Sequence, residues 1–181
     1  MQDKNQCKVY FISGVSGSGK TSTLKHLKEK LPSNTYDVRD LDERGVPDGG
    51  GLDWLNRETR HWLDVARVNA SQGRSTIICG FANPDLFKEV YRNDQDIPAQ
   101  LILLNVSGKN LESRLHGRHA TPESVKEIER ASGVSLEQFI KDNIEFAPEF
   151  RKIFDQNKYP IIETDERTPS EVADQIIELI R

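Results

Sequence analysis

The sequence predicts a three-layer α/β fold, in which helices cover both faces of a five-stranded parallel sheet, and three observations favour this class. Short apolar runs alternate with amphipathic stretches along the chain, which is the pattern of successive β-α units. Residues 101–104, Leu-Ile-Leu-Leu, are continuously apolar, as in a strand buried on both faces. The chain has 181 residues, 35% of them hydrophobic and 30% charged. This length and composition indicate a single globular domain spanning residues 1–181.

Five short segments have the composition of buried strands. We expect these strands at residues 8–13, 36–39, 76–80, 100–106 and 159–163. A first helix is expected over residues 23–31, where Pro32 closes it because proline cannot continue a helix. Most of the apolar runs are thus assigned to strands, and the amphipathic stretches between them are expected to be helices that cover the faces of the sheet.

A long helix is expected between the second and third strands, from a cap at Asp53 to about Gln72, with Gly73 ending it. Its buried stripe should contain Leu55, Trp62, Leu63 and Ala66. Further helices are expected to begin near Ser107, at Thr121, and at two capping boxes that open with Ser135 and Thr168. The glycine-rich segment 46–51 is expected to be a flexible loop within the domain.

Residues 14–21 read Gly-Val-Ser-Gly-Ser-Gly-Lys-Thr and match the phosphate-binding P-loop pattern G-x-x-x-x-G-K-[ST]. They lie between an expected strand and an expected helix, so that backbone N–H groups and the helix dipole can face an anion. Lys20 can then reach the β- and γ-phosphates, and the Thr21 hydroxyl can ligate Mg²⁺. The sequence therefore predicts a P-loop NTPase fold that binds a nucleoside triphosphate with Mg²⁺, and it leaves the choice of base open. The expected nucleotide-binding residues in this segment are Gly14, Ser16, Gly17, Ser18, Gly19, Lys20, Thr21 and Ser22.

Composition excludes several other classes of function. A formal charge of −4 and a pI near 5.6 argue against nucleic-acid binding as the main activity. No apolar run reaches membrane-spanning length, and the polar residues 1–8 lack the apolar core of a secretory signal, so we expect a cytoplasmic protein without a membrane partner. Cys7 and Cys79 have neither metal-binding nor redox spacing.

The segment 114–118, Arg-Leu-His-Gly-Arg, resembles the R-x-x-G-R run of adenylate kinases. Together with the P-loop and the order of elements, it makes most of the chain similar to the nucleotide-kinase branch of P-loop proteins, which includes adenylate, shikimate and gluconate kinases. The resemblance implies that Arg114 packs against adenine and that Arg118 reaches the transferring phosphoryl group. It also implies a short lid at about residues 119–135. The alternative is that both arginines only lie on a solvated helix face, since residues four apart share one.

Arg-Asp-Leu-Asp at residues 39–42 resembles the D-x-D motif of shikimate and gluconate kinases. In an extended segment Asp40 and Asp42 point the same way, so that one can orient Mg²⁺ and the other can accept a proton from an alcohol. We assign Asp40 to the metal with Thr21, and Asp42 to catalysis as the base. Asp-rich turns after strands are common without function. However, Cys79 and Asn105 stand where a Walker-B carboxylate is expected, which favours the D-x-D assignment.

The acceptor is expected to bind within residues 40–73, at Asp40, Asp42, Trp54, Arg57 and Arg60. The hypothesis is a small-molecule kinase that transfers the γ-phosphoryl group of ATP to a hydroxyl of a small metabolite, which can itself be anionic. Lys20, Asp42 and Arg118 are its catalytic residues. The alternative for Trp54 is packing, which is the more common role of such a tryptophan. The alternative for Arg57 and Arg60 is that they are only surface charges. Trp62 is expected in the core.

Two alternatives remain. The first is a nucleoside monophosphate kinase, whose anionic acceptor needs arginines and no base. The second is a nucleotide-dependent switch or regulatory ATP-binding protein. Asn-Lys-Tyr-Pro at residues 157–160 superficially resembles the N-K-x-D motif of GTPases, but it lacks the Asp and precedes a strand instead of following one. The sequence leaves the acceptor and the oligomeric state open.

Overall fold

A computed structural model of the protein describes residues 7–47, 49–92 and 96–181. Residues 1–6 of the polar N-terminal stretch and Asp48 of the glycine-rich loop lie outside this part of the chain. Within it, five parallel strands form one sheet in the order β2-β3-β1-β4-β5. The strands are β1 (Val9–Ser13), β2 (Tyr36–Asp40), β3 (Ser75–Cys79), β4 (Ala99–Asn105) and β5 (Ile161–Glu163). The predicted α/β class and five-stranded parallel sheet are confirmed.

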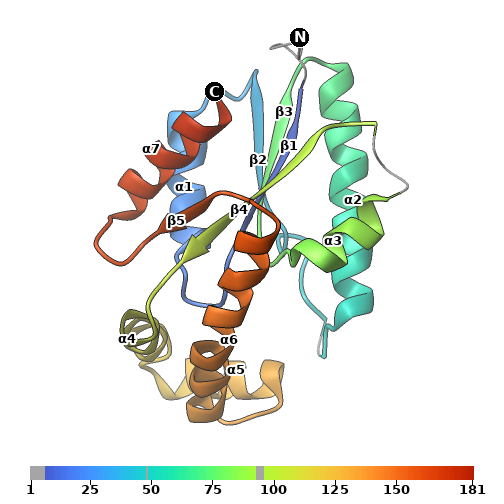
Figure 1. Ribbon diagram of the computed structural model, residues 1–181. Coiled ribbons are helices and arrows are strands. Elements are labelled where there is room, and N and C mark those ends of the chain that lie inside the picture. Colours follow the sequence, from blue (N-terminus) through green and yellow to red (C-terminus); the bar gives the residue numbers. More distant parts are fainter. Residues whose placement is uncertain (1–6, 48, 93–95) are drawn as a thin grey trace.

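Helices cover both faces of this sheet, as Figure 1 shows. One face packs against α1 (Lys20–Lys30) and α7 (Pro169–Ile180), and the other packs against α2 (Leu52–Ser71), α3 (Pro84–Tyr91) and α6 (Leu136–Gln156). Alternate strand residues divide between the two cores: Ile12 faces the α1 side and Phe11 the α2 side. α4 (Gly108–Arg118), α5 (Pro122–Ser132) and the start of α6 extend beyond the carboxyl ends of the strands. None of the helices in the described ranges has both the length and the apolar character needed to cross a membrane.

The helix starts follow their capping residues, with two corrections. The hydroxyls of Thr121 and Thr168 accept from backbone N–H groups three residues on, and both form full capping boxes. Ser135 caps α6 in the same way, but Gln138 does not complete a box, because its side chain donates to Asp142 at 2.6 Å.

The predicted cap at Asp53 is wrong. α2 begins at Leu52, two residues earlier than a cap at Asp53 would give, with Gly51 at the N-cap position and no side-chain cap, and Asp53 lies inside the first turn. A carboxylate there still interacts favourably with the helix dipole. The predicted stripe of α2 is confirmed, since Leu55, Trp62, Leu63 and Ala66 are all buried.

The sequence analysis did not predict α3, although its start is well marked. The Asn83 side chain accepts from the N–H groups of Asp85 (2.9 Å) and Leu86 (3.4 Å), and Pro84 occupies the first turn. All five strands lie where they were predicted, with ends that differ by one or two residues. β1 and β5 begin later than expected, β5 at Ile161, because Lys158 adopts a left-handed φ of 57° and Pro160 has no N–H to give to the ladder.

The loop after β2 is fixed against the end of β3, and this contact places the residues that follow. The Leu41 N–H donates to the Cys79 carbonyl at 2.8 Å, and the Trp62 indole N–H donates to the Leu41 carbonyl at 3.2 Å. Gly80 makes room for this loop, because a Cβ added there would lie 2.2 Å from the Leu41 Cβ. Asp40 and Asp42, on either side of Leu41, are thereby held at the carboxyl edge of the sheet.

Replacing Gly80 with alanine should lower the free energy of unfolding by about 1–3 kcal/mol, because the loop must move away from the new methyl group. Gly117→Ala is the matched control: the added Cβ meets nothing within 4 Å, and a helical glycine-to-alanine change should stabilise by about 0.5–1 kcal/mol. Urea unfolding of both variants checks this. Equal effects of the two substitutions would contradict the close approach of Leu41 to Gly80.

Candidate nucleotide and acceptor site

The phosphate-binding motif forms a loop between β1 and α1. Gly19 is the N-cap of α1 and has a φ of 100°, a left-handed conformation that favours glycine. No side chain caps the first turn of α1, and that turn contains no acidic residue. Its backbone N–H groups therefore remain available to an anion. The buried Ser18 hydroxyl also finds no hydrogen-bond partner within the described part of the chain.

Lys20 extends from this helix start back across the loop. Its ammonium group donates to the carbonyls of Gly14 at 2.7 Å and Val15 at 2.9 Å. Burial lowers the pKa of Lys20 to about 8, although the carboxylates of Asp42 and Asp40 act to raise it. Arg118 lowers the pKa of Lys20 slightly further. Lys20, Asp42 and Arg118, the three residues predicted to be catalytic, therefore lie close enough for their charges to interact.

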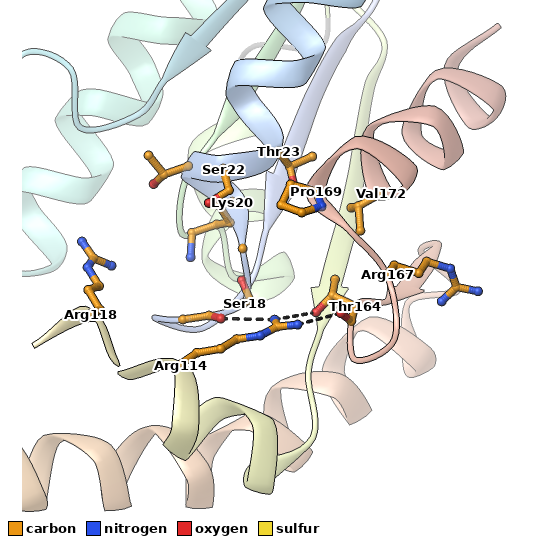
Figure 2. A pocket seen from close by; sticks show the side chains of 13 residues that line it. Ser18, Lys20, Ser22, Thr23, Arg114, Arg118, Thr164, Arg167, Pro169 and Val172 are labelled. Carbon is orange, nitrogen blue, oxygen red and sulfur yellow. Dashed lines mark hydrogen bonds between the residues drawn. The ribbon is translucent and has the colours of Figure 1, made fainter. Parts of the chain in front are cut away.

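A cavity of about 540 Å³ opens beside this loop (Figure 2). Its volume falls in the range typical of small-ligand sites, roughly 300–1,000 Å³. Most predicted nucleotide-binding residues line it, together with five residues that were not predicted from the sequence. The lining consists of Gly17, Ser18, Gly19, Lys20, Thr21, Ser22, Thr23, Arg114, Arg118, Thr164, Arg167, Pro169 and Val172.

Gly14 and Ser16, also predicted to bind nucleotide, do not line this cavity. Gly14 is buried behind the loop, where its carbonyl accepts from Lys20. The Ser16 N–H donates to the Asn143 side chain at 3.2 Å, so this part of the loop contacts α6. The missed residues Thr164 and Arg167 lie far along the chain, and only the packing of β5 against β4 and of α7 against α1 brings them here.

The two arginines of α4 differ in how they are held. Arg114 donates to the Gly17 carbonyl at 3.4 Å, to the Thr164 hydroxyl at 3.0 Å and to the Thr164 carbonyl at 2.7 Å. Arg118 is exposed at the end of α4, and in Figure 2 its guanidinium lies on the same side of the loop as the Lys20 amine. The structure thus brings both predicted arginines to the cavity, Arg114 in a fixed position and Arg118 with its guanidinium accessible.

The D-x-D pair lies close enough to Lys20 for both carboxylates to act on its charge. Asp40 ends β2, and its carboxylate accepts from the Asp42 N–H at 3.1 Å, so the turn is fixed by its own side chain. Asp42 reaches solvent, yet neighbouring protein partly removes it from water. This desolvation and the nearby Asp40 carboxylate raise the pKa of Asp42, while Lys20 opposes the rise.

Glu58 is a further carboxylate at this site that the sequence analysis missed. It is 9% exposed on α2, its charge contributes to the raised pKa of Asp42, and its carboxylate contacts Arg44 at 3.5 Å. Position 58 falls on the buried side of the amphipathic helix, between Leu55 and Trp62. A charged residue on such a side is the signal that could have identified it.

The other predicted acceptor residues on α2 point in different directions. Trp54 is half-buried and packs against the core on the α2 side of the sheet. Arg57 and Arg60 are exposed. At about 100° per residue they project opposite the stripe of Leu55 and Ala66. The structure therefore does not bring these two arginines toward Lys20 in the way it brings Asp40 and Asp42.

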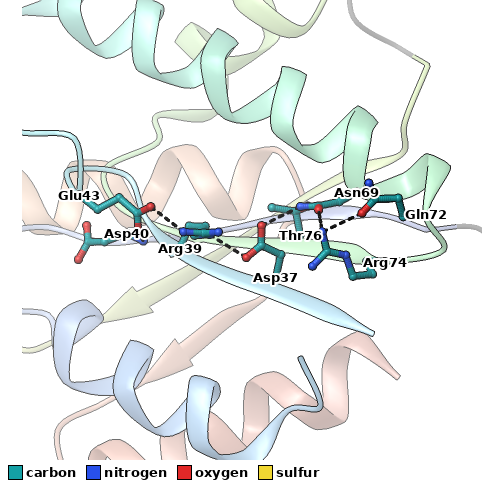
Figure 3. A network of polar contacts seen from close by, with 8 residues as sticks. All are labelled: Asp37, Arg39, Asp40, Glu43, Asn69, Gln72, Arg74 and Thr76. Atoms are coloured by element: carbon teal, nitrogen blue, oxygen red, sulfur yellow. Dashed lines mark hydrogen bonds and ion pairs between the residues drawn. The ribbon is translucent and has the colours of Figure 1, made fainter. Parts of the chain in front are cut away.

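Arg39, which precedes the D-x-D pair, is held by carboxylates instead of being available to a ligand (Figure 3). Its guanidinium donates to Asp37 at 2.7 Å and to Glu43 at 3.0 Å. Asp37 in turn accepts from the buried Asn69 amide at 2.8 Å, and Asn69 also donates to Thr76 at 3.0 Å. This network ties the C-terminal part of α2 to β2 and β3, and so supports the strand that carries Asp40.

Cys79 is buried, as predicted, and burial raises the pKa of its thiol to about 12. It is therefore neither a nucleophile nor a carboxylate substitute for a metal. In the described ranges, no three His, Cys, Asp or Glu side chains converge in a way that could hold a metal ion on their own. A metal at this site would need ligand oxygens from a bound phosphate, beside the Thr21 hydroxyl and the Asp40 carboxylate.

Lys20→Met should remove a pH dependence of stability. The pKa of Lys20 is about 8 in the folded protein and near its ordinary value of 10.5 in an unfolded chain. Between these two pKa values the unfolded chain keeps a proton on Lys20 that the folded protein has released. The free energy of unfolding therefore rises with pH in this range. Below pH 8 both states hold the proton, and Lys20 adds no pH dependence.

Urea unfolding at about pH 7, 8.5 and 10 checks this, with Lys25→Met on the exposed side of α1 as control. We expect the stability of the wild type minus that of Lys20→Met to rise over this range. A difference that stays constant, or one that Lys25→Met reproduces, would contradict a poorly solvated charge at Lys20.

No protein-family model matches the chain, and no curated protein matches it. Solved structures do resemble it over nearly its whole length. Shikimate kinase from Acinetobacter baumannii in complex with shikimate is 16% identical, covers 97% of this chain and 94% of its own, and has a TM-score of 0.59. The Mycobacterium tuberculosis APS kinase in complex with AMPPNP and APS is 16% identical, with coverages of 97% and 98% and a TM-score of 0.60.

Thymidylate kinase from Candida albicans is similar at 15% identity, covering 97% of this chain and 91% of its own, with a TM-score of 0.58. At such low identity the likeness establishes the fold. The predicted resemblance to P-loop kinases is confirmed at that level: the chain has the three-layer α/β fold that these kinases share.

Proposed function

We propose that the protein is an ATP-dependent kinase that transfers the γ-phosphoryl group to a hydroxyl of a small metabolite. The observation that carries this proposal is the convergence of Lys20, Asp40, Asp42 and Arg118 at the carboxyl edge of the sheet. The charges of the other three residues act on the pKa of Lys20, and those of Asp40 and Lys20 act on the pKa of Asp42. A phosphate-binding lysine thus lies next to a carboxylate that can serve as a base. The kinase fold supports the proposal without naming a substrate.

The loop of residues 14–21 is proposed to hold the triphosphate. Free N–H groups at the start of α1 and the unpartnered Ser18 hydroxyl suit an anion with several oxygens. Lys20 would exchange its bonds to the Gly14 and Val15 carbonyls for phosphate oxygens, which also compensate its charge. Thr21 and Asp40 are the residues proposed for Mg²⁺, which would neutralise phosphate charge when bound.

Asp42 is proposed as the general base. The pKa of Asp42 is raised above that of an ordinary Asp and so lies closer to neutral pH. This makes its carboxylate a better proton acceptor for an alcohol. Arg118 is proposed to meet the transferring phosphoryl group, because a guanidinium can bind two of its oxygens. The segment 119–135, which contains α5, is proposed to close over the site and exclude water.

An alcohol fits this site better than a monophosphate does. A nucleoside monophosphate would add negative charge beside Asp40, Asp42 and Glu58, so it would require arginines with accessible guanidinium groups. Arg39 and Arg44 already pair with carboxylates, and Arg57 and Arg60 project from the exposed side of α2. The acceptor is proposed to bind within residues 40–73, with Trp54 beside it.

The GTPase-like segment 157–160 supports no switch function, because the Asn157 side chain is already bonded to Lys88 and to the Ile153 carbonyl.

The test uses ATP labelled at the γ-phosphate, with a panel of small alcohols and nucleoside monophosphates as acceptors. We expect transfer to an alcohol. With the best acceptor, Asp42→Asn should lower kcat by about 100-fold or more, because the proton loses its acceptor. The dissociation constant for ATP should change little, since Asp42 does not line the nucleotide cavity.

The control is Glu43→Gln, an exposed neighbouring carboxylate that pairs with Arg39. It should retain most of the activity. The wild-type kcat/KM should fall on acidification at a higher pH than an ordinary Asp would produce, because the pKa of Asp42 is raised. Transfer to monophosphates alone, or full activity of Asp42→Asn, would contradict the proposed base.

A further inference from the structure

The loop that follows β5 is attached to α4 by one carboxylate. Asp165 accepts from the Ser107 N–H at 3.0 and 3.2 Å, from the Ser107 hydroxyl at 3.0 Å and from the Asn110 amide at 2.8 Å. Ser107 is the N-cap of α4. The carboxylate therefore lies where backbone N–H groups are unpaired and the helix dipole is positive, which is the favourable end for an anion.

Arg114 makes a second connection in the same place, one that reaches the phosphate loop. From the middle of α4 it donates to both oxygens of Thr164 and to the Gly17 carbonyl. Thr164 is buried and itself bonds the Asn105 carbonyl of β4 through its N–H at 2.9 Å and its hydroxyl at 3.0 Å. The guanidinium thus spans the cavity floor between the loop after β5 and the P-loop (Figure 2).

These contacts divide the cavity into two parts that are held differently. The phosphate part belongs to the loop between β1 and α1, which is held by its own turn, from the Ser18 N–H to the Val15 carbonyl at 3.2 Å, and by the contact of Ser16 with Asn143 of α6. The opposite wall consists of Arg114, Thr164, Arg167, Pro169 and Val172, residues of α4 and of the chain around the β5–α7 connection. Asp165 joins these two segments at the start of α4, two turns before Arg114. Although partial burial favours protonation, the hydrogen bonds from Ser107 and Asn110 keep the pKa of Asp165 low, so the contact persists at neutral pH.

We propose that Asp165 is a positioning residue for the nucleoside half of the nucleotide site. It sets the place of α4 against the β5–α7 connection, and thereby orients Arg114 and the wall against which base and ribose would lie. The phosphate half depends on it less, because Arg114 reaches the loop only through the long hydrogen bond to the Gly17 carbonyl at 3.4 Å. This inference rests on the proposed function only in taking the ligand to be a nucleoside triphosphate.

The test compares two ligands that differ in the nucleoside alone. Asp165→Asn keeps the size of the side chain and removes its charge, and calorimetric titration measures binding of Mg-ATP and of inorganic tripolyphosphate with Mg²⁺. We expect the dissociation constant for ATP to rise about tenfold, the size typical for loss of a charged hydrogen-bonding group. The constant for tripolyphosphate should stay within about twofold, which damage to the whole domain would not allow.

Two further variants accompany it. Asn110→Ala removes one donor to Asp165 and leaves the carboxylate in place, so it should weaken ATP binding in the same selective way, to a smaller extent. Glu163→Gln is the matched control: this carboxylate lies two residues away, and its partners are Arg151 at 2.6 Å and Asn105 at 2.7 Å, neither of which belongs to α4. It should leave both constants unchanged.

The inference is overturned if Asp165→Asn and Asn110→Ala bind ATP as the wild type does, or if both ligands weaken equally. Because this test measures ligand binding and not phosphoryl transfer, it can be interpreted even if no acceptor is found for the kinase reaction. Wild-type protein that binds ATP selectively but transfers nothing would contradict the proposed function and not the role of Asp165.

Discussion

An ammonium group with little access to water has to be compensated by nearby oxygens, and the arrangement around Lys20 follows from this requirement. The carbonyls of Gly14 and Val15 accept hydrogen bonds from it, and the carboxylates of Asp40 and Asp42 act on its charge from the end of β2 and the loop that follows. Compensation is incomplete, since the pKa of Lys20 stays well below its ordinary value. A polyphosphate would supply the missing negative charge, and this is the physical reason why the loop should favour such a ligand.

The scaffold brings the two sides of the site together through the order of its strands. β1 carries the P-loop and lies next to β3 and β4, while β2 carries the aspartates at the edge beyond β3. The close approach of Leu41 to Gly80 and the network from Arg39 to Asn69 fix the end of β2. On the other side, Arg114 and Asp165 connect α4 to the chain after β5. Charges of both signs therefore lie near Lys20, the carboxylates at the end of β2 and the guanidinium groups on α4.

Features set by local chemistry were predictable from the sequence, and features set by tertiary packing were not. The strand positions, to within one or two residues, and the caps at Thr121 and Thr168 depend on neighbours within a few residues, and they are confirmed. The loop of residues 14–21 lies between a strand and a helix, as predicted. The cap of α2 was misassigned because Asp53 has a favourable side chain, whereas the chain geometry places Gly51 at that position. Thr164 and Arg167 reach the cavity only through the packing of β5 and α7, which no local pattern encodes. The outward direction of Arg57 and Arg60 could have been predicted, because it follows from the same helical periodicity that identified the buried stripe of α2.

The most direct test of the account is a crystal structure with a non-hydrolysable ATP analogue and Mg²⁺. The account predicts the triphosphate in the loop of residues 14–21, with the Lys20 ammonium moved from the Gly14 and Val15 carbonyls to phosphate oxygens. Asp42 should then face the γ-phosphate side of the site, ready for an acceptor. A structure in which the analogue binds elsewhere, or in which Lys20 keeps both of its bonds to the loop carbonyls, would contradict it.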